Sequence, residues 1–76
     1  MMKKVDAVYL RHIRDAISRI EEYTRAVGYD DFIESSLIQD GVIRQLEIIG
    51  EATKRLSDEL KDRYPHVPWR DVAGMR

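Results

Sequence analysis

Apolar side chains recur every three or four residues along two long stretches of this 76-residue sequence, and this spacing limits the fold most. In an α-helix, that spacing places the side chains on one face. In the stretch Val5–Val27 the face comprises Val5, Tyr9, Ile13, Ala16, Ile17, Ile20, Tyr23 and Val27. In the stretch Leu37–Arg63 it comprises Ile38, Val42, Leu46, Ile49, Thr53, Leu56 and Leu60. The sequence therefore predicts two long amphipathic helices.

Polar and glycine residues between the two stretches predict how the helices end and begin. Gly28 directly follows the first stretch, where a left-handed C-cap favours glycine. Asp30 and Asp31 are suited to cap a small extra turn in the connection. Ser36, with Gln39 three residues later, predicts a capping box at the start of the second helix.

A short third helix is predicted after the second stretch. Tyr64 precedes Pro65, and the residue before a proline avoids the helical region, so the second helix should end there. Pro68 suits the first turn of a helix over "WRDVAG", residues 69–74. We expect Trp69 to anchor this helix on the hairpin.

Two amphipathic helices with a tight connection should fold back as an antiparallel hairpin. The expected class is all-α, with one domain over residues 1–76, because a chain this short has room for one small core. One hairpin leaves much of both apolar faces uncovered. The hairpin therefore predicts further helices, supplied by this chain or by a second copy.

Composition limits the function classes. There is no cysteine, which excludes a disulfide framework and thiolate metal sites, and we expect no metal or other cofactor. The 13 basic and 14 acidic residues are interspersed, so no general attraction to nucleic acid is predicted and any RNA contact needs a local cleft. No apolar run long enough for a signal peptide or membrane span occurs, which predicts a cytoplasmic protein with no membrane partner.

Two segments resemble a known family. "QDGVIRQLEIIGEATKRLSDELKDRYPHVPWRDVAGMR" resembles the second helix and following turn of HepT-like proteins of the HEPN superfamily, and "AVYLRHIRDAISRIEEYT" resembles their first helix. The resemblance implies a homodimeric bundle of four or five helices. It also implies a toxin that cuts RNA without metal and is paired with a nucleotidyltransferase antitoxin. Residues 1–76 would form the N-terminal part of one such domain.

The family's catalytic motif is an arginine, four to six residues, a histidine, and a tyrosine two residues later. In similar members the arginine directly follows "AGM", so Arg76 matches it. The motif histidine and tyrosine have no position in these 76 residues. We therefore expect a chain cut short after the motif arginine, and no ribonuclease activity from the 76 residues alone.

Four charged residues lie away from the apolar face of the second helix: Arg44, Glu47, Glu51 and Arg55. One interpretation is a solvated face, on which Glu51 and Arg55 form a helix pair. The other is a polar cluster that lines the cleft of a dimer and positions the motif residues. Gly50 beside them suggests close packing, because glycine weakens a helix.

Two histidines remain. His12 lies at the edge of the first apolar face, and we expect it to be partly buried and structural. His66 should be a surface loop residue. A non-catalytic function also stays open, in which the chain is a helical dimerisation or binding module that pairs with the antitoxin or with an intact toxin protomer.

Overall fold

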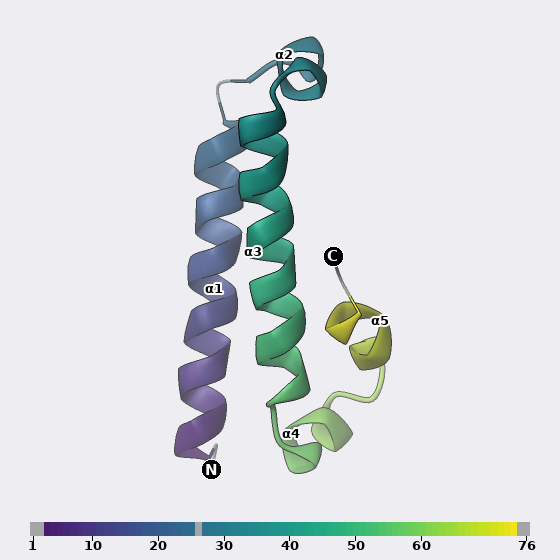
Figure 1. The fold of residues 1–76 in the computed structure, drawn as a ribbon. Coiled ribbons are helices and arrows are strands. Elements are labelled where there is room, and N and C mark those ends of the chain that lie inside the picture. The colour runs from purple at the N-terminus through teal and green to yellow at the C-terminus, as the bar shows by residue number, and fades with distance from the viewer. Residues whose placement is uncertain (1–2, 26, 75–76) are drawn as a thin grey trace.

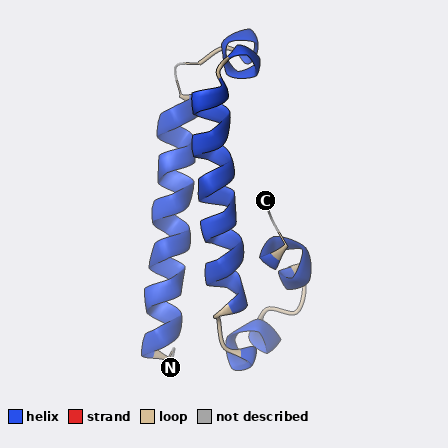
Figure 2. Ribbon diagram, in the orientation of Figure 1, coloured by secondary structure: helices blue, strands red, loops and turns tan. Residues whose placement is uncertain are grey.

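The computed structural model describes residues 3–25 and 27–74, and every regular element in them is helical (Figure 2). The helices are α1 (Lys4–Thr24), α2 (Tyr29–Glu34), α3 (Ser36–Lys54), α4 (Asp58–Arg63) and α5 (Trp69–Ala73). The predicted all-α class is therefore confirmed. No helix in the described parts of the chain combines the length and apolar character needed to cross a membrane.

Helices α1 and α3 form the predicted antiparallel hairpin, and the two helices lie side by side along most of their length (Figure 1). The molecule is elongated, with principal extents of 43 × 20 × 17 Å. The buried apolar core lies between the two helices and extends toward α4. Its described members are Ala16, Ile49, Ala52, Leu56 and Leu60. The predicted face of the second stretch thus supplies most of the core.

The face of α1 is buried less than its spacing predicts. Ala16 is buried, but Val5, Ile17 and Tyr23 stay exposed. The Tyr23 ring lies across Gly41 of α3, where a Cβ atom would come within 3.2 Å of the ring. The hairpin therefore leaves part of the predicted apolar face of α1 uncovered.

The spacing predicted one helix over the second stretch, but the structure has two. Helix α3 ends at Lys54 and α4 begins at Asp58. Ser57 caps α4, because its hydroxyl accepts a hydrogen bond from the Leu60 N–H at 3.2 Å. Leu56, within the break, and Leu60, in α4, are both buried. The apolar spacing continues across the break, which explains why periodicity alone did not reveal it.

The connection between α1 and α3 differs from the prediction in its caps. Helix α1 ends at Thr24 rather than at Val27, and the Thr24 hydroxyl donates to the Ile20 carbonyl at 2.8 Å. Gly28 has φ of −72°, so it is not a left-handed C-cap; it is the N-cap of α2. Asp30 lies in the first turn of α2, which makes the predicted extra turn a six-residue helix.

The start of α3 is capped by Ser35 rather than by Ser36. The Ser35 hydroxyl accepts a hydrogen bond from the α3 backbone at 3.2 Å. The Gln39 side chain does not close a capping box. Its amide donates to the carbonyls of Phe32 at 2.9 Å and Ile33 at 2.6 Å, and so secures the end of α2.

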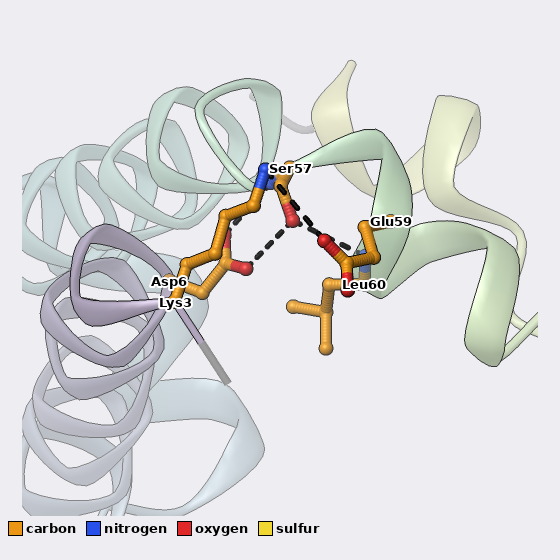
Figure 3. A network of polar contacts seen from close by, with 5 residues as sticks. All are labelled: Lys3, Asp6, Ser57, Glu59 and Leu60. Carbon is orange, nitrogen blue, oxygen red and sulfur yellow. Dashed lines mark hydrogen bonds and ion pairs between the residues drawn. The ribbon is translucent and has the colours of Figure 1, made fainter. Parts of the chain in front are cut away.

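A buried carboxylate joins the start of α1 to the start of α4 (Figure 3). Asp6 is 2% exposed and accepts hydrogen bonds from the Ser57 hydroxyl at 2.6 Å and the Ser57 N–H at 2.8 Å. These hydrogen bonds lower the pKa of Asp6, the hydroxyl contributing most. Lys3 and Glu59 form an exposed ion pair at 3.7 Å beside them. We call the Asp6 and Ser57 contacts the clasp.

Trp69 anchors α5, as predicted. Its indole N–H donates to the carbonyls of Lys61 at 3.2 Å and Tyr64 at 3.0 Å, at the end of α4. The turn formed by α4 therefore holds α5 against α3, on the side of α3 away from α1 (Figure 1). Gly50 of α3 is buried, in agreement with the close packing expected there.

Candidate functional site

A groove of about 280 Å³ opens between α1 and α3. Two residues of α1, five of α3 and the residue directly after α3 line it. They are Tyr9, His12, Arg44, Glu47, Ile48, Glu51, Ala52 and Arg55. The apolar floor comes from half-buried Ile48 and buried Ala52, and the charged side chains stand at the rim. We call this depression the α1/α3 groove.

The groove brings together four of the sequence-predicted site residues. Arg44, Glu47, Glu51 and Arg55 all line it and all are exposed. They share one side of α3 because successive members are three or four residues apart. The fifth predicted residue, Arg76, lies outside the described residues. Whether the α3 charges position a motif arginine therefore stays a prediction.

The predicted helix pair of Glu51 with Arg55 is not formed. Glu51 instead forms an ion pair with Lys54, the residue before Arg55, at 3.2 Å. Across residues 3–25 and 27–74, no carboxylate lies within 4.0 Å of the guanidinium of Arg44 or Arg55. Both arginines therefore present free hydrogen-bond donors to the groove from within this part of the chain.

His12 is not the partly buried structural residue that its position predicted. Its side chain is exposed and lines the groove, and its ring meets the Tyr9 ring edge-on, with centroids 5.6 Å apart. His12 and Ile48 also line a second cavity of about 190 Å³, which adjoins the groove. A helical wheel places His12 beside the apolar face but cannot tell on which side the neighbouring helix leaves a gap. The sequence did indicate that the two rings are neighbours, because Tyr9 and His12 are three residues apart on a helix.

The side chains of the groove support binding more directly than bond cleavage. Arginine offers a planar fork of donors that matches phosphate. Carboxylates accept hydrogen bonds from hydroxyl and amino groups. No group of three potential ligands that could hold a metal ion occurs in the described residues. His66 is exposed beside Tyr64, away from the groove lining, as predicted.

Comparisons with known proteins agree on one family. Residues 13–76 match the sequence model of the family described as "Ribonuclease HepT-like". The chain is 49% identical over 75 residues to a Methanocaldococcus jannaschii protein named "Gamma-glutamylcyclotransferase and putative RNase". It is 45% identical over 75 residues to a Thermococcus cleftensis protein named "Probable ribonuclease HepT".

Both alignments cover 99% of this chain but only part of each relative. The chain spans 34% of the length of the first protein and 68% of the second. No solved structure matches the chain significantly. The resemblance read from the two sequence segments is therefore confirmed at the level of the family.

Proposed function

We propose that this chain, which belongs to the HepT-like family, forms the RNA-holding part of a ribonuclease domain. One observation carries the proposal. Within the segment matched to the family, four charged side chains predicted to line a cleft gather on a single groove. Helix spacing alone gathers the four on one side of α3, but it does not require that this side face a groove whose other wall is Tyr9 and His12 of α1.

In the proposed reaction, Arg76 binds the scissile phosphate and stabilises its developing charge. A histidine supplied beyond these 76 residues moves the proton of the 2′-hydroxyl or of the leaving oxygen. No residue of this sequence takes that histidine's place. Cleavage is therefore proposed for the complete domain, without metal, and the 76 residues alone are proposed to be inactive.

The proposed assembly and setting follow the family resemblance. The domain acts as a homodimer in the cytoplasm, and a nucleotidyltransferase antitoxin restrains it. Uncovered apolar side chains on the hairpin and on the segments next to it support an association of some kind. The large ones described as exposed are Val5, Val8, Ile17, Tyr23, Tyr29, Ile33, Leu37, Ile43 and Tyr64.

The same apolar surface favours a second candidate function. A chain that never acquires the motif histidine would act as a binding module, paired with the antitoxin or with an intact toxin protomer. It would hold a partner without cutting RNA. The two functions differ in whether the complete reading frame supplies a histidine after Arg76.

Growth arrest tests the proposed ribonuclease. The complete reading frame containing these residues is expressed in a bacterial host, beside its Arg76→Ala and Arg70→Ala variants. Arg70 is an exposed arginine of α5 and serves as the matched control. We expect arrest with the parent and with Arg70→Ala, and growth with Arg76→Ala. Arrest that persists in Arg76→Ala would refute the role given to this arginine.

A further inference from the structure

His12 occupies a position that a structural histidine does not need. It is exposed, contributes nothing to the core, and stands where the groove meets the adjoining cavity. Its imidazole meets the Tyr9 ring edge-on, with the ring centroids 5.6 Å apart, and both rings line the groove. The α1 wall is therefore aromatic, with one half-buried ring supporting one exposed ring.

The opposite wall carries the charges. Arg44 and Arg55 lie eleven residues apart, which corresponds to about 16 Å along a helix. Between them, Glu47 and Glu51 add acceptors on the same wall. The groove thus has a cation at each end of its charged wall, acceptors between them and an apolar floor.

This arrangement matches the chemistry of a nucleotide in a flexible strand. Unpaired bases of single-stranded RNA stack on tyrosine, histidine and arginine side chains, while basic side chains track the phosphates. Carboxylates accept hydrogen bonds from amino groups of bases or from a ribose hydroxyl. The volume of about 280 Å³ falls just below the roughly 300–1,000 Å³ of small-molecule clefts, so the groove has room for a base while the phosphates of the strand lie along the charged rim.

We propose that the α1/α3 groove binds single-stranded RNA, with a base stacked on the His12 ring, which Tyr9 supports edge-on, and phosphates at Arg44 and Arg55. This inference rests on the proposed function and assigns a substrate-holding site to it. His12 is a binding residue here, not the motif histidine. A free mononucleotide offers the same chemistry, and the test separates it from RNA.

Binding and cleavage are measured on the same samples. The 76-residue chain is titrated into a 5′-fluorescein RNA decamer at 50 mM and 200 mM salt, and binding is read by fluorescence anisotropy. A denaturing gel reports cleavage separately. The variants are His12→Ala, Arg44→Ala and Arg55→Ala. The controls, Ser18→Ala on α1 and Arg63→Ala on α4, change exposed residues outside the groove lining. Circular dichroism verifies that each variant is helical.

We expect His12→Ala to weaken binding about 5- to 150-fold, the range for losing one stacked base. Affinity should fall less steeply with salt in Arg44→Ala and in Arg55→Ala. The negative slope of log affinity against log salt should become shallower by about 0.7 in each, because each variant removes one phosphate contact. Arg63→Ala removes the same charge and should leave the slope unchanged. Ser18→Ala should bind as the parent does.

The outcomes separate the two proposals. RNA binding that depends on the groove, without cleavage by the complete protein, supports the groove and refutes the ribonuclease. Cleavage by the complete protein, with binding unchanged in all three groove variants, refutes the groove alone. Absence of RNA binding by the parent chain also refutes the groove. Competition by adenosine monophosphate as strong as that by unlabelled RNA, at equal nucleotide concentration, would overturn RNA as the occupant.

Discussion

The clasp between α1 and α4 predicts a difference between two serines that otherwise play the same part. Ser35 caps α3 and Ser57 caps α4, and each hydroxyl accepts a backbone hydrogen bond at 3.2 Å. Only Ser57 also donates its hydroxyl to a carboxylate, Asp6, at 2.6 Å. Ser35→Ala is therefore a matched control that removes a cap alone, while Ser57→Ala removes a cap and the hydroxyl's hydrogen bond to Asp6; the bond from the backbone N–H of residue 57 to Asp6 remains.

The magnitudes follow from these contacts. Loss of an N-cap side chain costs about 0.5–2 kcal/mol. A hydrogen bond to a charged group contributes about 1.5–3 kcal/mol. We therefore expect Ser35→Ala to lower the free energy of unfolding by about 0.5–2 kcal/mol, and Ser57→Ala by about 2–5 kcal/mol. A chain of this length has a total stability of about 4–11 kcal/mol, so the second change removes a large share.

Urea unfolding followed by far-ultraviolet circular dichroism measures both variants, first at pH 7. The Asp6 pKa is lowered in the folded protein, so the carboxylate stabilises the fold above its usual titration range. That contribution is lost as the pH falls through the lowered pKa. The excess cost of Ser57→Ala should therefore shrink in acid. Equal losses for the two serines at pH 7, or an excess that grows in acid, would refute the reasoning.

Three further changes test the fold. Leu56→Ala should cost about 2–5 kcal/mol in urea unfolding, because Leu56 is 3% exposed; a cost below about 1 kcal/mol would contradict its place in the core. Asp6→Asn should be less stable than the parent at pH 7 and approach it as the pH falls below the usual aspartate range; a constant gap in the pH series would argue against the clasp. Trp69→Phe should cost about 1 kcal/mol in a urea series, because the indole N–H bonds are lost; unchanged stability would contradict this anchor.

The hairpin was predictable because apolar spacing reports a helical face directly. The four most C-terminal members of the second face, Ile49, Thr53, Leu56 and Leu60, are all buried. The break between α3 and α4 was not predicted because Leu56 and Leu60 keep the same spacing across it. Ser57 followed by two acidic residues was the overlooked signal, since that pattern is typical of a helix start.

Long-range contacts escaped the sequence for a different reason. Asp6 and Ser57 are 51 residues apart, and a single aspartate on a helix normally predicts a solvated position. Ser35 rather than Ser36 is the N-cap of α3, and the Gln39 amide donates to the carbonyls of Phe32 and Ile33 in α2. Neither arrangement has a local pattern that would reveal it.

The candidate site was predictable in part. The charges on α3 line one groove because one helix presents them together, and their role in a cleft stays a prediction. The contribution of α1 was missed, because burial of His12 depends on how closely α1 and α3 approach. The role of Arg76 stays a prediction from the family motif.

Cleavage of RNA in the presence of a chelator tests the central claim most directly. The protein from the complete reading frame is purified and incubated with a labelled RNA and excess EDTA, beside the same oligonucleotide with 2′-deoxy sugars. The account predicts that the RNA is cut, that the deoxy oligonucleotide is left intact, and that the 76-residue chain cuts neither. A folded, complete protein that leaves the RNA intact, or cuts it only when a divalent metal is restored, would contradict the account.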